Sequence, residues 1–249
     1  MRKAGKIVAK TLAELGKAIA PGVSTIELDR IAESVITKEG GKPSFKGYRG
    51  FPNSICVAIN DEVVHGIPSE RTLKEGDIIG IDLGAQFSGY HADAAITFPV
   101  GEISPQAKKL LKVTEQALYK GIEKAKPGNR VSDISLAIQN WVEGHGLAVV
   151  RDLVGHGIGK ELHELPEVPN FGKTGRSIKL KAGMTLAIEP MVNLGSPEVK
   201  TGPDNWTVKT RDGSLAAHFE HTVLITPKGP EILTLGSQKV EGLLVKRTK

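Results

Sequence analysis

Two histidines of this chain occur in the same three-residue word, His-Gly-Ile. His65 lies in "VVHGIP" and His156 in "LVGHGIG", although the chain has only seven histidines. Neutral imidazole is a common ligand of transition metals and an acid or base near neutral pH. Short shared words also arise by chance, and a hydrogen-bonded structural histidine is the simplest alternative for His65. The repeated word indicates a duplicated site only if other polar residues repeat in the same order.

Carboxylates do repeat in that order. The stretch "LKEGDIIGID", which ends at Asp82, aligns with "LKAGMTLAIE", which ends at Glu189. The next strands, "DAAITF" and "EHTVLIT", relate Asp93 to Glu220. A single acid at a strand end is commonly a surface residue. Asp82 and Glu189, however, follow apolar runs, and a buried carboxylate is costly unless it is paired or metal-bound.

The segment between Asp82 and Asp93 predicts a β-hairpin. A turn centred near Phe87 and Ser88 would return the chain and place residues 82 and 93 opposite each other, about 5 Å apart. Two carboxylates that close repel each other unless a proton or a cation lies between them. The hairpin therefore predicts a cation site.

Around a pseudo-twofold axis the second copy would bring its acids to the same place. Four carboxylates balance two divalent cations, and oxygen ligands together with an imidazole favour Mn, Fe, Co or Zn. Two cations about 3.5–4 Å apart can bridge a water molecule and lower its pKa. We therefore predict metal-assisted hydrolysis. The predicted ligands are Asp82, Asp93, His156, Glu189 and Glu220.

Two helices are expected before the strands of each copy. Ser24 with Glu27, and Ser104 before Pro105, have the form of helix N-caps. The predicted buried positions are Val8, Leu12, Leu15 and Ile19 in the first helix, Leu28, Ile31 and Val35 in the second, and Leu110, Leu111, Thr114, Ala117 and Leu118 in the third. "PGNRVSDISL" then repeats "PGVSTIEL" with two extra residues. The pattern predicts an α+β fold of two related halves, at about 1–100 and 101–249, with a mixed sheet and helices on one side.

Length and composition predict one compact domain, 1–249, which the polar residues described above would make a catalytic domain. Cys56 is the single cysteine, which favours a reducing cytoplasm, and we find neither a secretory signal nor a membrane span. The net charge of +5 raises the question of nucleic acid, but the densest basic stretches, 173–181 and 245–249, lack interleaved aromatics. We expect no membrane, no specific DNA and a monomer, and leave a ribosome contact open.

The assembled motifs closely resemble the type I methionine aminopeptidases, which are pita-bread (creatinase/aminopeptidase) metallohydrolases. The resemblance runs from about residue 3 to 238 and rests on "NSICVAINDEVVHGIP", "GHGIGKELHELPEVPNFG", "GMTLAIEPMV" and "WTVKTRDGSLAAHFEHTVLIT". It implies a curved, mostly antiparallel sheet with helices on its outer face. It also implies removal of the initiator methionine from nascent chains, with a preference for a small second residue.

The family's metal ligands fall on the same five residues, with Asp93 and Glu220 bridging the two cations. By the same resemblance Glu189 relays a proton, His65 lies near the scissile amide nitrogen and His163 lies at the carbonyl oxygen. Symmetry had suggested His65 as a ligand, and here we follow the family. The other four histidines are expected to be structural: His91, His145, His218 and His221.

The resemblance also implies an apolar pocket for the methionine side chain. Its expected lining residues are Phe45, Tyr48, Phe51, Cys56 and Trp206. Related enzymes often have an aromatic residue where this chain has Leu162, which leaves the shape of the pocket open. Two alternatives remain: an X-Pro aminopeptidase or dipeptidase of the same fold, whose members usually carry an extra N-terminal domain, and a non-catalytic pita-bread binding protein.

Overall fold

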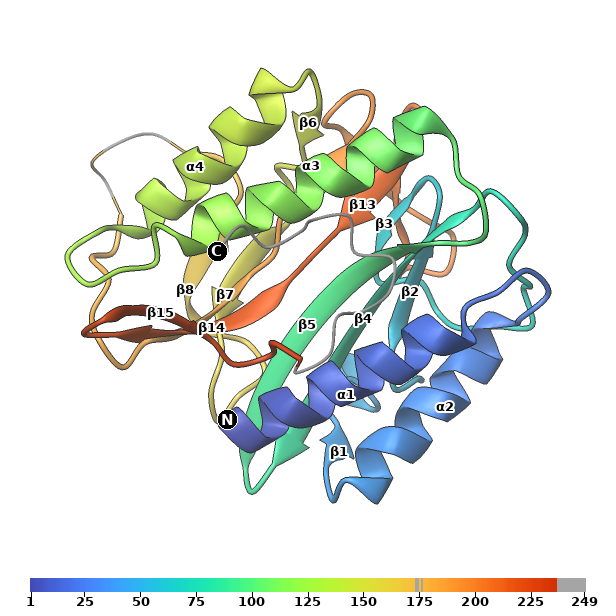
Figure 1. The fold of residues 1–249 in the computed structure, drawn as a ribbon, viewed down its shortest axis with the longest axis horizontal. Helices are drawn as coiled ribbons and strands as arrows, with labels where there is room; N and C mark the ends of the chain where they lie inside the picture. The colour runs from blue at the N-terminus through green and yellow to red at the C-terminus, as the bar shows by residue number, and fades with distance from the viewer. Residues whose placement is uncertain (173–174, 176, 237–249) are drawn as a thin grey trace.

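The computed structural model describes residues 1–172, 175 and 177–236. The basic tail 245–249 and three residues of the basic stretch 173–181 lie outside this part of the chain. Figure 1 shows two pairs of helices beside a set of curved strands. The helices are α1 (Arg2–Ala18), α2 (Thr25–Lys38), α3 (Pro105–Ile122) and α4 (Val131–Gly144), with a short 3-10 turn η1 (Tyr48–Gly50).

Helix caps form at the predicted residues. The Ser24 hydroxyl accepts a hydrogen bond from the Glu27 N–H at 3.4 Å, and the Ser104 hydroxyl accepts one from the Ala107 N–H at 3.1 Å. Pro105 occupies the first turn of α3, where a missing N–H costs nothing. Both caps therefore satisfy N–H groups that the helix itself leaves free.

The predicted buried face holds for α3, and it needs one correction each in α2 and α1. Leu28 is buried as expected, but the stripe continues through Ala32 and Ile36, while Ile31 and Val35 are only half-buried. Residues four apart follow one side of a helix, so α2 is rotated relative to the predicted stripe. Ile19, predicted in the α1 stripe, is the extended residue that ends that helix.

The strands are short except for one hairpin. In the first half they are β1 (Lys42–Pro43), β2 (Cys56–Ile59), β3 (Glu62–Val64), β4 (Ile78–Phe87) and β5 (Tyr90–Pro99). In the second half they are β6 (Ala148–Val149), β7 (Val154–Gly157), β8 (Glu164–Pro169), β9 (Thr185–Ile188), β10 (Met191–Asn193), β11 (Val199–Thr201), β12 (Val208–Thr210), β13 (Ala216–His218), β14 (His221–Thr226) and β15 (Gly229–Ile232).

Strand pairing separates the halves into two larger sheets. In the first, β4 pairs with β1, β2 and β5; in the second the order is β15-β14-β9-β7-β8. Two smaller sheets, β13-β10-β6 and β11-β12-β3, complete the arrangement, and β12-β3 joins strands of both halves. All these pairs are antiparallel.

Hydrogen bonds between β5 and residues 218–222 close the seam between the halves. The Glu220 N–H donates to the Ala95 carbonyl at 2.9 Å. On one side of this contact the Thr222 hydroxyl accepts from the Asp93 N–H and donates to the Asp93 carbonyl, both at 2.8 Å. The seam therefore holds Asp93 and Glu220 side by side through the backbone.

One large core lies between the helices and the sheets and runs through both halves. Helix α1 packs against the β4–β5 hairpin, and α3 packs against β9, β10 and β13. The predicted α+β class, with helices on the outer side of curved sheets, is confirmed. Among the described residues no helix is both long and apolar enough to cross a membrane.

Candidate metal centre

The five predicted ligands line one cavity between the two halves. Asp82 lies on β4, Asp93 on β5 and His156 on β7, while Glu189 follows β9 and Glu220 lies between β13 and β14. The cavity has a volume of about 180 Å³. Strands from both halves therefore bring four acids and an imidazole to one cavity.

The hairpin presents Asp82 and Asp93 differently from the prediction. Phe87 pairs with Tyr90, so the turn consists of Ser88 and Gly89, one residue later than expected. Both turn residues have positive φ (50° and 79°), as a tight two-residue hairpin turn requires. The prediction that Asp82 and Asp93 lie directly opposite each other is therefore wrong, because this turn sets a different register.

Asp82 pairs instead with Ala95, and Asp93 pairs with Gly84. The two acids are therefore diagonal neighbours on one face of the hairpin, which is still close enough for side chains to interact. In the second half Ile188 pairs with His221, and Glu189 and Glu220 come next at the end of that ladder.

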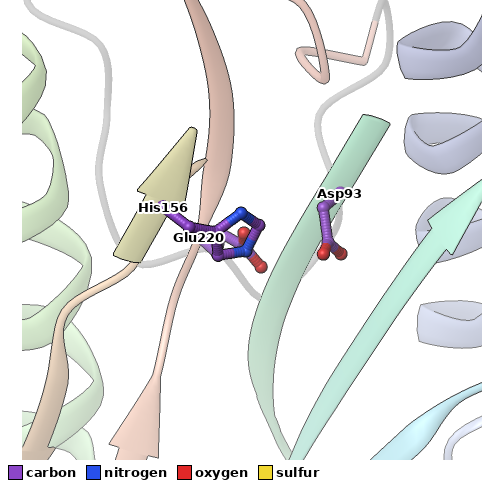
Figure 2. Close-up of side chains that lie close together, drawn as sticks. All are labelled: Asp93, His156 and Glu220. Carbon is purple, nitrogen blue, oxygen red and sulfur yellow. The ribbon is translucent and has the colours of Figure 1, made fainter. Parts of the chain in front are cut away.

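Three of the five predicted ligands have polar atoms that lie close together. One atom each of Asp93, His156 and Glu220 lies within 4.8 Å of the other two, and all three residues are buried. Figure 2 shows His156 and Glu220 close together, with Asp93 across from them on the neighbouring strand. The His156 Nε2 also lies 3.5 Å from Glu189 Oε1.

Burial and mutual repulsion disfavour four charges here. Burial raises the pKa of Asp82, Glu189 and Glu220 well above the usual range, and the Asp93 carboxylate adds to each shift. Burial also raises the pKa of Asp93 to about 7. The charged form of each acid is thus unfavourable without a compensating cation.

Carboxylate oxygens without hydrogen-bond partners also indicate a cation site. Asp82 Oδ1, Asp93 Oδ1 and Glu220 Oε1 are buried and have no hydrogen-bond partner among the described residues. Buried polar atoms are normally hydrogen-bonded, so such a group of orphan oxygens needs an explanation. Divalent cations would satisfy these atoms and neutralise the acids together, and the residues present therefore fit a metal centre.

The backbone near His156 sets which ring nitrogen faces the acids. Its Nδ1 lies 2.8 Å from the Gly157 carbonyl oxygen. A carbonyl can only accept, so the proton is on Nδ1 and the Nε2 lone pair points toward the acids. The residue that precedes His156 in the chain is Gly155, and a Cβ atom at this position would lie 2.5 Å from the Ala187 carbonyl oxygen. Only glycine allows β7 to approach β9 this closely.

The other two predicted histidines also line the cavity. His65 follows β3 with a positive φ of 62°, and burial lowers its pKa. The pKa of His163 is lowered to about 4, mainly by burial and then by His156, whose ring centroid is 4.2 Å away. Both imidazoles are therefore neutral near pH 7.

The predicted pocket residues form a second wall of the cavity. Phe45, Phe51 and Cys56 are buried and pack with Ile158 and Leu162, and Tyr48 and Trp206 lie half-buried against them. The Phe51 and Trp206 rings meet edge to face, with centroids 5.1 Å apart. The structure therefore brings all five predicted pocket residues together beside the acids.

Two features of the site were missed by sequence reasoning. His218, expected to be structural, is buried, and its Nε2 lies 3.6 Å from Glu189 Oε2. Its position two residues before Glu220 was the available signal, since alternate residues of an extended segment share a face. The second feature is the Tyr48 hydroxyl, which lies 2.9 Å from His163 Nδ1.

The remaining histidines lie away from the acids or face other partners. His91 contacts the Ser44 hydroxyl and the Gln86 amide, and His145 contacts the Trp141 carbonyl. His221 Nδ1 lies 2.9 Å from the Thr234 hydroxyl. These contacts hold loops and strands in place.

Comparison with known proteins gives one consistent family. The model of metallopeptidase family M24 matches residues 1–227. A methionine aminopeptidase of Clostridium perfringens is 60% identical over 235 residues, which cover 94% of each chain. The crystal structure of a Thermotoga maritima methionine aminopeptidase superposes with a TM-score of 0.93 at 49% identity, covering 94% of each chain.

More distant structures share the fold. An Xaa-Pro dipeptidase from Bacillus anthracis superposes with a TM-score of 0.75 at 24% identity, over 96% of this chain but only 60% of its own. The fold is thus common to several peptidases, while the high identity is to methionine aminopeptidases.

Proposed function

This chain belongs to metallopeptidase family M24, and from that premise we propose that the four acids of its cavity hold two divalent cations for the removal of N-terminal methionine from nascent polypeptides. The chain is a metal-dependent aminopeptidase, since relatives of 60% identity over 94% of its length are methionine aminopeptidases. The observation that carries the two-cation proposal is the convergence of four carboxylates and one imidazole, from both halves, on one cavity; Asp93, Glu220 and His156 are buried there.

Each acid has a distinct place in the proposed centre. Asp93 and Glu220, joined at the seam, would bridge the cations, and Asp82, His156 and Glu189 would complete the ligand set. Bound cations would supply Lewis acidity and lower the pKa of a shared water. Cobalt, manganese, iron and zinc all suit this mixture of oxygen and nitrogen ligands.

The remaining polar groups fit the proton transfers of peptide hydrolysis. Glu189 would accept a proton from the attacking water, because its carboxylate faces the centre. His163 would donate a hydrogen bond to the carbonyl oxygen as negative charge develops there. His65, which also lines the cavity, would assist the amide nitrogen as it leaves.

The apolar wall would select methionine. A flexible, polarisable thioether packs well on aromatic rings, and Phe45, Phe51 and Trp206 provide such rings. The buried Leu162 leaves more room than an aromatic residue would at that position. We extend the proposal to a preference for a small second residue, as the family resemblance implies.

The cellular context of the proposal follows from its substrate. Nascent chains are made in the cytoplasm, and the single buried cysteine suits a reducing compartment. A monomer suffices, since one chain supplies every residue of the site. A ribosome contact through the basic surface would bring the enzyme to its substrate.

The experiment compares two peptides on the purified protein supplied with Mn²⁺ or Co²⁺. Turnover of Met-Ala-Ser with little turnover of Ala-Pro peptides would support the proposal. The reverse preference would favour the X-Pro alternative. Failure to cleave either peptide, with metal bound, would favour a non-catalytic binding protein of this fold.

A further inference from the structure

Tyr48 and His163 form a contact across the two halves of the molecule. The Tyr48 hydroxyl lies 2.9 Å from His163 Nδ1, and the two rings stack with centroids 5.2 Å apart and planes 22° apart. Among the described residues, His163 is the only hydrogen-bond partner of this hydroxyl. Tyr48 therefore meets His163 through both its ring and its polar end.

The segment that carries Tyr48 is held in one shape. The Tyr48 N–H donates to the Phe45 carbonyl, and the Phe51 N–H donates to the Tyr48 carbonyl, both at 2.9 Å. Gly47 has a φ of 85°, which favours glycine, and the Arg49 guanidinium lies 5.4 Å from the centre of the Tyr48 ring. A ring supported in this way can fix the orientation of a neighbour.

We propose that Tyr48 is a positioning residue for His163: its hydroxyl donates a hydrogen bond to Nδ1 and thereby keeps the imidazole proton on Nε2. This inference rests on the proposed function, in which His163 donates to the carbonyl oxygen of the substrate. Only a protonated Nε2 can donate to that oxygen. If Nδ1 donated to Tyr48 instead, neutral His163 would present a lone pair to the developing negative charge.

The neighbouring His156 shows why the partner at Nδ1 matters. There the partner is the Gly157 carbonyl, an obligate acceptor, so Nε2 carries a lone pair suited to a metal ligand. At His163 the partner is a hydroxyl, which can donate. Two imidazoles with ring centroids 4.2 Å apart are thus set in opposite tautomers, one to bind a cation and one to donate.

This role differs from that of a pocket wall. Phe45, Phe51 and Trp206 also line the cavity, and an apolar ring is all that a wall requires. A wall residue affects how tightly the methionine side chain binds. A residue that sets the His163 tautomer affects the step in which charge develops on the carbonyl oxygen. The ratio of the two kinetic effects therefore separates the roles.

The kinetic test uses Tyr48→Phe, which keeps the stacked ring and removes the hydroxyl. We expect kcat on Met-Ala-Ser to fall about 10-fold with KM changed less than about twofold, the size typical of partners that orient a functional histidine. Phe45→Leu should show the opposite split, with the larger change in KM. Tyr90→Phe, which removes a hydroxyl at the exposed tip of the hairpin, should match the wild type.

Unchanged kcat in Tyr48→Phe, or a change confined to KM, would overturn the inference. An inactive wild type would count against the proposed function instead, so the two failures are distinguishable. Melting temperatures of all variants show whether the fold is retained.

A spectroscopic test does not depend on turnover. In zinc-loaded protein with ¹⁵N-labelled histidine, the His163 signals, assigned by their loss in His163→Asn, should show a protonated Nε2 and an unprotonated Nδ1. In Tyr48→Phe the two shifts should move toward each other as the tautomers mix. A protonated Nδ1 in the wild type, or shifts unaffected by the substitution, would overturn the inference.

Discussion

The two halves supply acids to the same cavity from unlike positions. In the first half Asp82 and Asp93 lie inside a ladder of two ten-residue strands and are diagonal neighbours. In the second half Glu189 and Glu220 lie beyond the last pair of the four-residue β9, with Glu replacing Asp. The longer side chains extend from a strand end, while the shorter ones lie on a rigid ladder.

The matched histidines diverge further. His156 lies within β7, is buried and has its Nδ1 bound to a backbone carbonyl. His65 follows β3 in a positive-φ conformation, is half-buried and has no hydrogen-bond partner among the described residues. A repeated word in the sequence therefore need not mean a repeated role. The backbone around each copy decides what its side chain can do.

The most severe test of the shared centre is Asp93→Asn. Loss of this carboxylate, which we propose bridges the two cations, should lower kcat/KM by more than about 1,000-fold, beyond the ~10–100-fold typical of partners that only orient a ligand. Because burial opposes the charge of Asp93, the metal-free variant should melt no lower than the metal-free wild type. Measurable activity within about 10-fold of wild type would show that the halves do not share a cation through this residue.

Substitution of His156 and of His65 should reduce activity for different reasons. His156→Ala should lose bound metal after dialysis, measured by elemental analysis, together with activity. His65→Ala should keep its metal content and lose about 100-fold in kcat, as expected for a residue that assists proton transfer. Equal loss of metal in both variants would instead support the hypothesis, suggested by the sequence repeat, that His65 is also a metal ligand.

Stability of the metal-free protein should fall as pH rises from about 6.5 to 8. The pKa of Asp93 is raised to about 7, so the folded state holds a proton that the unfolded chain has released, and this stabilisation is lost as pH rises through 7. The raised pKa values of Asp82, Glu189 and Glu220 add to this fall. The lowered pKa values of His156, His163 and His218 act in the opposite direction near pH 6.5, where histidine in the unfolded chain is still partly protonated.

The expected change is a drop of a few degrees in melting temperature between these pH values, measured by calorimetry. Metal-loaded protein should lack this drop, because bound cations hold the carboxylates ionised. A melting temperature of the metal-free protein that rises over the same range would contradict the assigned direction.

The smallest effect concerns the turn that sets the first-half register. Ser88→Asn, which suits the first position of a two-residue turn with positive φ, should raise the free energy of unfolding by about 0.5 kcal/mol. Ser88→Val should lower it by ~1–3 kcal/mol, since a β-branched residue is strained there. Denaturant titration measures both, and equal stability of the two variants would contradict the turn's role.

Much of the fold could be predicted because it follows from local patterns. The capped helices and the apolar strands depend on neighbours within a few residues, and the repeated order of these elements predicted two related halves. The α2 stripe shows the limit. Several faces of α2 carry apolar residues, and only the packing around Leu28 selected Ala32 and Ile36 for burial.

The sequence by itself determined which residues gather at the centre, since each of the five polar residues lies in or beside a strand that its copy repeats. Tertiary structure alone decided how they are used. The two-residue turn made the aspartates diagonal, the Gly157 carbonyl turned the His156 lone pair toward the acids, and the 45–51 segment brought the Tyr48 hydroxyl to His163. The strand register, the histidine tautomer and the contacts between distant segments all depend on which backbone segments pack together in the folded chain. A short stretch of sequence does not specify that packing.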